Sequence, residues 1–361
     1  MTLRFGAGLI TCQRYPGDPR TSEELYAEAL ELAARAEELG LDSVFVSEHH
    51  FVDDGYTPSL LPLCAAIAAR TSRIQIGTGV LLAPLHHPVR LAEDAAVVDL
   101  ISGGRLVLGV GLGWRPEELK VFGVPTGERV QRLEQAIAVL RESWSDGLVT
   151  SAPGVSAPFA VWPKPSRRDG SREDGSREDG PPIWIGAMSE PGIRRAGRIA
   201  DGVMLTEVAP DGLARQLQWA EDERARRHPP HRGFTRSVHV PVFAWEEGDA
   251  FALSSRYLHY VTWKYADMEA SWGRTVPARA PSPGESDLAA VRAAALTGTP
   301  AEVAEAVAAY CAAAEGDLHF VARVYLPGLP REVQLEALRL YACEVVPAVR
   351  ALVGTTRAAR S

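Results

Sequence analysis

The stretch Ser43-Val44-Phe45-Val46-Ser47-Glu48-His49-His50-Phe51 decides the fold class, because a short apolar run leads directly into three ionisable side chains. Residues 43–47 have the length and β-branched content of a strand buried in a parallel sheet. In parallel barrels the active site lies at the carboxyl ends of the strands, where ionisable residues gather. The stretch therefore predicts an α/β protein whose site includes residues 48–50.

Short β-rich runs alternate with amphipathic helices on both sides of this stretch. In the first predicted helix, 22–39, leucine and alanine recur on one face, Ser22 is the expected N-cap, and Gly40 ends the helix. The other predicted strands are 3–10, 73–80, 105–111, 182–186, 202–205, 237–245 and 318–325, and the other predicted helices are 58–71, 88–101, 129–144, 190–200, 211–227, 300–314 and 331–352. Eight strands, each followed by a helix, predict one (β/α)8 TIM barrel over residues 1–361, with an open doubly wound sheet as the alternative.

Two insertions interrupt the alternation, after strands four and seven. The first, 146–181, contains three tandem pentapeptides between Ser166 and Gly180 that hold no apolar residue, so we expect a disordered surface loop. The second, 246–287, is rich in Trp, Tyr, Arg and Pro. It predicts either a lid over the site or a helix that packs its aromatic side chains on the barrel.

The composition of the chain limits the classes of molecule that we expect it to bind. The formal net charge of −8 argues against nucleic acid and anionic membranes as partners, and no apolar run is long enough to span a bilayer. The four cysteines are scattered, without a CxxC pair or metal-ligand spacing. We therefore expect a cytoplasmic protein with reduced, mostly buried thiols that acts on a small molecule.

Glu48, His49 and His50 are the predicted catalytic residues. Imidazoles beside a carboxylate can hydrogen-bond a reactive intermediate or move a proton near neutral pH. A metal site that also includes His86 and His87 is the alternative. Because adjacent residues of an extended chain point to opposite sides, these five side chains cannot all face one ion, and no metal is predicted.

Two glycine-containing turns are candidate cofactor contacts. Residues 109–114 carry three alternating glycines and then Trp114, but they lack the last glycine and the helix start of a dinucleotide fingerprint, so we interpret them as backbone that admits a flat ring. The turn that holds Ala187, Met188, Ser189 and Gly192 precedes a helix. Its backbone N–H groups and the helix dipole favour the binding of a phosphate. The alternative interpretation is that Ser189 only caps the helix.

Taken in order, the motifs at 47–51, 76–80, 87–94, 102–105, 122–124 and 297–302 resemble those of the bacterial luciferase-like monooxygenase family. The resemblance implies a homodimer formed through the helices that flank strands two and three, and a flavin lying across the strand ends. His49 matches the histidine that assists flavin oxygenation, with Glu48 and His50 beside it. Gly79 and Val80 match the residues under the isoalloxazine, often joined by a non-prolyl cis peptide.

Within the same resemblance, Met188, Ser189 and Gly192 match the phosphate-binding turn. One position departs from the pattern: Leu112 stands where luciferase has an arginine for the flavin phosphate. Relatives that use the deazaflavin F420 also lack that arginine and have a tryptophan at the position of Trp114. Arg115 or Arg194 could supply the missing charge.

Three functions follow from these observations. The leading one is a monooxygenase that takes reduced FMN from a separate reductase and oxidises a small organic substrate with O2 through a C4a-peroxyflavin. The second is F420-dependent hydride transfer, without oxygen. The third is a non-catalytic flavin-binding subunit, which the ionisable residues at 48–50 argue against.

Overall fold

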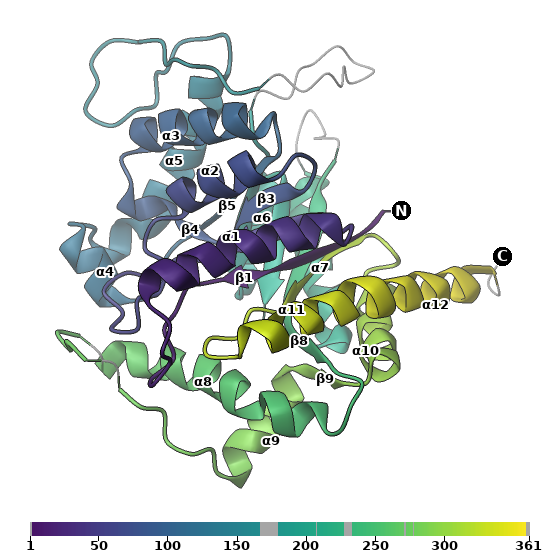
Figure 1. Cartoon of the computed structure of the whole chain (residues 1–361). Coiled ribbons are helices and arrows are strands. Elements are labelled where there is room, and N and C mark those ends of the chain that lie inside the picture. The colour runs from purple at the N-terminus through teal and green to yellow at the C-terminus, as the bar shows by residue number, and fades with distance from the viewer. Residues whose placement is uncertain are drawn as a thin grey trace.

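The fold is a closed parallel barrel, seen here in a computed structural model that describes residues 2–166, 180–206, 208–226, 233–270, 272–276 and 278–358. Eight strands pair in parallel in the order β1-β2-β3-β5-β6-β7-β8-β10, and β10 pairs with β1 to close the ring (Figure 1). These strands are β1 Leu3–Ile10, β2 Ser43–Val46, β3 Gln75–Thr78, β5 Leu106–Gly111, β6 Ile183–Ala187, β7 Gly202–Thr206, β8 Thr235–Ala244 and β10 Leu318–Arg323. The predicted (β/α)8 TIM barrel is confirmed, and the open sheet is excluded.

Helices cover the outside of the barrel. They are α1 Ser22–Glu38, α2 Leu60–Arg70, α3 Pro88–Ser102, α5 Arg129–Trp144, α6 Glu190–Ile199, α7 Pro210–Arg224, α10 Pro300–Ala313, α11 Arg331–Leu340 and α12 Val346–Ala358. The cap predicted at Ser22 is wrong by one residue. Thr21 accepts a hydrogen bond from the Glu24 amide at 3.3 Å, and the Glu24 carboxylate accepts one from the Thr21 amide at 2.7 Å, because Glu24 stands at the position that a capping box requires after Thr21.

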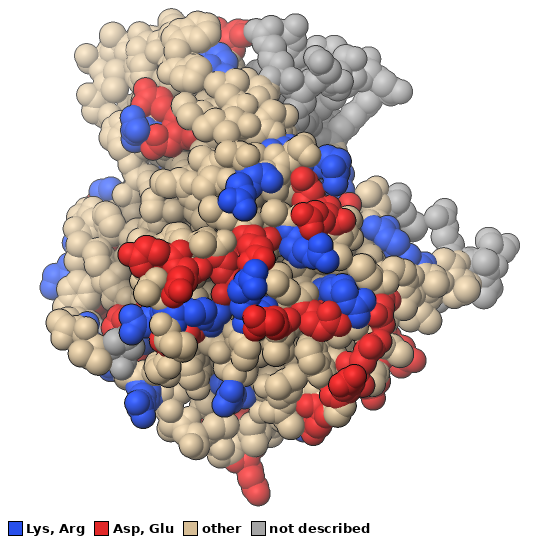
Figure 2. All heavy atoms as spheres, viewed as in Figure 1, with Lys and Arg blue, Asp and Glu red and all other residues tan. Residues whose placement is uncertain are grey.

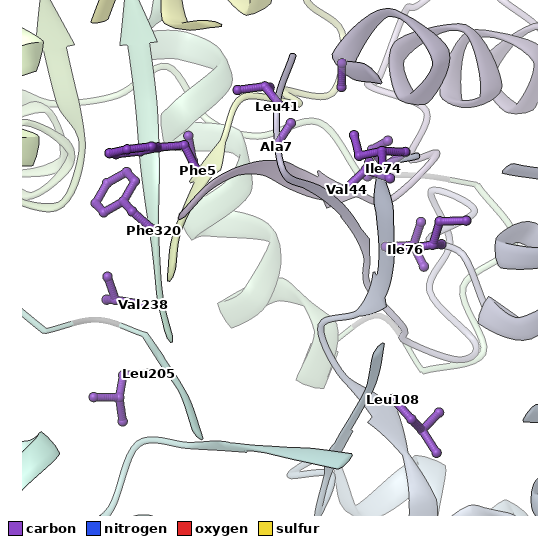
Figure 3. Packing of buried hydrophobic residues seen from close by; sticks show 14 of the residues in the cluster. Phe5, Ala7, Leu41, Val44, Ile74, Ile76, Leu108, Leu205, Val238 and Phe320 are labelled. Atoms are coloured by element: carbon purple, nitrogen blue, oxygen red, sulfur yellow. The ribbon is translucent and has the colours of Figure 1, made fainter. Parts of the chain in front are cut away.

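Successive side chains of each strand point alternately to the outside and to the inside of the barrel, so the apolar ones form two separate cores. Figure 3 shows outward-facing residues such as Val44, Leu108 and Phe320, which belong to the large cluster between strands and helices. The inward-facing residues form a second cluster that fills the barrel: Leu9, Phe45, Val107, Trp184, Met204 and Val321. Because the barrel is filled by side chains, a ligand has room only at its ends.

Further strands and helices of the described chain lie outside the barrel sequence: β4 Leu81–Leu82, α4 Pro116–Val121, α8 Ala250–Ala270, α9 Glu285–Ala294 and β9 Leu296–Gly298, which pairs with β8. The insertion 246–287 contributes α8, whose Tyr257 and Tyr260 pack against Tyr15 at ring centroid distances of 5.7 and 4.7 Å. In the insertion 146–181, Val149 and Phe159 form an antiparallel bridge. The pentapeptide loop lies outside the described residues, apart from its ends.

The face shown in Figure 2 carries acidic and basic side chains in alternation, without a continuous positive patch. The surface of α1 and α11 accounts for part of it, with ion pairs such as Arg331–Glu31 and Arg339–Glu336. Within the described parts of the chain, no helix combines the length and the apolar character needed to cross a bilayer.

Candidate active site

His49 is the centre of the candidate site, just beyond β2 at the carboxyl end of the barrel. Its Nδ1 lies 3.0 Å from Oε1 of Glu118, a residue of α4, and the same oxygen accepts a hydrogen bond from the His50 amide at 2.8 Å. Burial raises the pKa of the Glu118 carboxyl, but the hydrogen bond and charge of His49, the His50 amide and Arg115 together lower it. The carboxylate therefore stays charged, accepts the proton of Nδ1, and leaves Nε2 of His49 for a ligand.

Glu48 and His50 form a separate pair. Nε2 of His50 lies 2.8 Å from Oε1 of Glu48, and the His50 ring contacts Phe122 at 4.8 Å between centroids. The three predicted catalytic residues thus divide into His49, which is bound by Glu118, and a His50–Glu48 pair. Within the described residues, no three His, Cys, Asp or Glu side chains gather closely enough to hold a metal ion.

Three aromatic rings surround His49. Tyr56, Tyr265 and Trp114 lie edge-on to it, at centroid distances of 4.9, 5.5 and 5.8 Å. The Tyr56 hydroxyl donates to Ser47 Oγ at 3.0 Å and lies 3.2 Å from the Tyr265 hydroxyl. Burial raises the pKa of Tyr56 well above its ordinary value. Tyr56 therefore acts as a neutral hydrogen-bonding group in an apolar setting.

A buried ion cluster fixes α8, which supplies Tyr265, to the loop after β2. Lys264 pairs with Asp53 of that loop and with Asp267 at 2.8 Å, and Arg274 also reaches Asp53 at 3.1 Å. The side chains of Lys264 and Asp53 are fully buried. In α8, the insertion 246–287 forms the helix that packs aromatic side chains on the barrel, which was one of the two predictions. The other prediction, a lid that moves over the site, stays a prediction.

Neither arginine suggested for the missing flavin-phosphate charge is free to supply it. Arg115 is fully buried and donates to the carbonyl oxygens of His50 at 2.6 Å and Met268 at 2.8 Å. Arg194 pairs with three carboxylates, of which Glu190 is nearest at 2.8 Å. Arg129, which the sequence did not single out, donates to the Gly113 carbonyl at 3.3 Å and forms no ion pair with a described carboxylate.

Val80, a predicted cofactor residue that follows β3, packs against glycines of β5 and β6. The Gly79–Val80 peptide is cis, as the resemblance implied. A Cβ added at Gly111 would lie 2.5 Å from Val80 Cγ2, and one added at Gly186 would lie 2.6 Å from Val80 Cγ1. Gly111 therefore makes room for the Val80 side chain, and the interpretation that residues 109–114 admit a flat ring stays a prediction.

The turn between β6 and α6 holds the other predicted cofactor residues. Ala187 is half-buried, Met188 is 59% exposed, and Gly192 is buried. Ser189 is the N-cap of α6, yet its hydroxyl makes no capping hydrogen bond. Ordinary capping by this side chain is therefore not what the structure shows. The first-turn N–H groups of α6, apart from the one that Pro191 lacks, have no partner within the helix.

Comparison with known proteins identifies the family. The family model described as luciferase-like monooxygenase matches residues 6–314. The chain belongs to this family. A curated relative named F420-dependent glucose-6-phosphate dehydrogenase, from Microbacterium testaceum, is 37% identical over 187 residues, 50% of this chain and 52% of the relative. Another, from Acinetobacter baylyi, is named flavin-dependent trigonelline monooxygenase, oxygenase component, and is 30% identical over 47% of this chain and 45% of the relative.

Among solved structures, monooxygenase RslO1 from Streptomyces bottropensis superposes with a TM-score of 0.77 at 25% identity, covering 95% of this chain and 99% of that one. The chain spans about half the length of the curated relatives that it matches. The two relatives are named as a dehydrogenase and a monooxygenase, and the predicted luciferase-like family is confirmed. The similarities do not choose between the flavin and the F420 reaction.

Proposed function

We propose that this chain is an FMN-dependent monooxygenase that oxidises a small organic substrate with O2. The observation that carries the proposal is the charged hydrogen bond between His49 and Glu118 at the mouth of the barrel, under three aromatic rings. The bond to Glu118 fixes the orientation of the imidazole, and His49 is only 5% exposed, so the access of water is limited, as oxygen chemistry on a flavin requires.

The residues around the mouth fit FMN. Val80 and Trp114 offer apolar surfaces for the ring, and the turn that holds Ala187, Met188, Ser189 and Gly192 offers the start of a helix to the phosphate. The uncapped Ser189 hydroxyl is the observation that supports the fit. Arg129, beside Gly113, would supply the positive charge that Leu112 cannot.

Bound reduced FMN supplies the electrons that activate O2. The residues of this chain orient the catalytic imidazole and shield it from water. Glu118 holds Nδ1 of His49, so that Nε2 can donate a proton to, or accept one from, the reacting atoms. Tyr56, Tyr265 and Trp114 cover His49 and keep water away. The His50–Glu48 pair holds the chain beside it.

The second candidate is hydride transfer with F420, and a specific pair of observations favours it. Leu112 and Trp114 follow the F420 pattern, and several curated relatives are named F420-dependent glucose-6-phosphate dehydrogenase, such as the one that is 37% identical. In that case His49 would exchange a proton with the substrate, and no oxygen would be consumed.

Two partners belong to the proposal. A separate reductase would deliver the reduced flavin, because the Acinetobacter baylyi relative is named as an oxygenase component. A second copy of this chain would cover the outer face of α3, where Val97, Leu100 and Ile101 are 44%, 44% and 50% exposed.

Anaerobic titration with reduced FMN and with reduced F420 tests the proposal. We expect saturable binding of reduced FMN, and, after O2 is admitted, faster release of hydrogen peroxide from the His49→Ala protein than from the wild type. The Arg132→Gln protein is the control, since Arg132 is exposed and pairs with Glu128. Tighter binding of F420 than of FMN would replace the proposal by the second candidate.

A further inference from the structure

Arg323 lies at the same end of the barrel as His49. It is the last residue of β10, whose side chains alternate between the two faces of the strand. Val321 belongs to the cluster inside the barrel, so Arg323, two residues later, projects to the same side at the carboxyl end of the strand. Although it is a cation, Arg323 is only 3% exposed.

The guanidinium of Arg323 has unused donors. Its Nε and Nη2 are buried without a hydrogen-bond partner, and no carboxylate among the described residues forms an ion pair with it. Buried charges in folded proteins are nearly always paired, because an unpaired one loses its hydration without compensation. The fully buried Arg115, for example, donates to the carbonyl oxygen of His50. Arg323 therefore lacks the counter-charge that its position requires.

The positions of the unused donors on the guanidinium favour one class of ligand, a carboxylate. Nε and Nη2 lie on one edge of the guanidinium, the fork that binds both oxygens of a carboxylate. His239 of β8, the neighbouring strand, also has an unpartnered buried Nε2. Burial, helped by the charge of Arg323, lowers the pKa of His239 to about 3, so this imidazole is neutral and can hydrogen-bond an anion's neighbouring atoms.

Arg323 is also placed to share a ligand with His49. Its charge acts to lower the pKa of Tyr56, although burial raises that pKa overall, and the Tyr56 ring contacts His49 at 4.9 Å between centroids. Around the ring, β1 and β2 separate β10 from β3, and β7 and β8 separate it from β6. The residues proposed for FMN follow β3, β5 and β6, so Arg323 lies across the mouth from them.

We propose that Arg323 binds a carboxylate group of the substrate, so that the enzyme acts on an organic acid held between β10 and His49. This substrate class rests on the proposed function, since it assigns the far side of the mouth to the molecule that is oxidised. The guanidinium binds and orients the acid through two parallel hydrogen bonds, and it takes no part in bond making.

Equilibrium binding to the flavin-free protein tests the assignment. The probes are formate, acetate and benzoate, each compared with its neutral amide (formamide, acetamide and benzamide) at constant ionic strength. We expect the wild type to bind at least one acid about tenfold or more tighter than its amide, since hydrogen bonds to charged groups are the strong ones. Arg323→Met should lose the preference, Arg323→Lys should keep part of it, and Arg132→Gln should keep all of it.

The outcomes are distinct from those of the FMN titration. Equal affinity for every acid and its amide in the wild type, including no saturable binding of either, overturns the proposal without requiring any variant to fold. A preference that survives in Arg323→Met also overturns it, as does a selective loss of reduced-FMN binding in that variant, which would assign the guanidinium to the flavin. An acid preference in a protein that fails to bind FMN would leave the carboxylate site standing and refute the flavin function alone.

Discussion

Replacing Glu118 by glutamine separates the charge of this residue from its shape. Oε1 accepts hydrogen bonds at 2.8 Å from the His50 amide and 3.0 Å from His49 Nδ1, and an amide oxygen of the same size can keep both. A charge-assisted hydrogen bond contributes about 1 kcal/mol more than a neutral one, so the two bonds together lose about 2 kcal/mol. The hydrogen bond to His49 accounts for about 1 kcal/mol of this loss, which corresponds to about a fivefold change in the rate of a step that depends on His49.

The second oxygen adds little to the cost. Oε2 of Glu118 is buried without a hydrogen-bond partner, so the –NH2 group that takes its place finds no acceptor. An unpartnered polar group therefore stands at this place before and after the substitution, and the total stays at about 2 kcal/mol. For a chain of 361 residues this lowers Tm by about 3 °C if unfolding is two-state, from the usual entropy of unfolding per residue.

Two assays check these values. In differential scanning calorimetry, Tm of Glu118→Gln should fall by that amount at pH 7, whereas Glu128→Gln, which removes one side of an exposed ion pair, should change Tm little. After O2 is admitted to protein loaded with reduced FMN, Glu118→Gln should release peroxide about fivefold faster than the wild type. Unchanged Tm and peroxide release in Glu118→Gln would refute the assignment of Glu118 as the residue that holds His49.

The contribution of Glu118 to the stability of the fold depends on pH in a definite direction. The pKa of Glu118 is lowered by folding, so its contribution to stability is complete above its ordinary value of 4.5 and is lost as the pH falls through the folded-state pKa. The Tm difference between wild type and Glu118→Gln should therefore narrow below about pH 4.5. A difference that stays constant from pH 7 to pH 3.5 would contradict a charged carboxylate at this position.

Three further predictions concern the cofactor, the barrel and the dimer. Arg129→Gln should weaken FMN binding about tenfold, by fluorescence titration, while lumiflavin, which has no phosphate, should bind as before; equal effects on both would contradict a phosphate contact. Gly111→Ala should destabilise the protein by about 1–3 kcal/mol, because its Cβ would lie 2.5 Å from Val80 Cγ2, whereas Gly127→Ala meets no atom within 4 Å; equal Tm values would refute this packing. The wild type should have twice the chain mass of 39.0 kDa in light scattering, and Ile101→Glu should have that mass once; a monomeric wild type would refute the dimer.

The barrel could be predicted because its signals are local. The strand Leu3–Ile10 and the helix Arg129–Trp144 begin and end where the sequence predicts, since β-branched runs and helical periodicity act over a few residues. The long helix predicted over 331–352 proves to be α11 and α12, joined by a π-helical turn at Tyr341–Val345. The short helix α4 was missed, because six residues are too few to show a period.

The site could be predicted only in part, because its partners are far apart in the chain. His49 and the cis Gly79–Val80 peptide follow from the family motif. Glu118 contacts His49 across 69 residues, and nothing in Pro116-Glu117-Glu118 tells which carboxylate turns inward. Arg323 did leave a signal, since it is the one acidic or basic residue in an otherwise apolar stretch from Phe320 to Leu326. Its unpaired guanidinium, however, is visible only once burial is known.

A crystal structure of the protein with FMN bound would test the central claim most directly. We predict that the isoalloxazine lies against Val80 within about 3 Å of His49 Nε2, the reach of a hydrogen bond, and that the phosphate contacts Ser189. A flavin bound away from His49, or a metal ion held by that imidazole, would contradict the account.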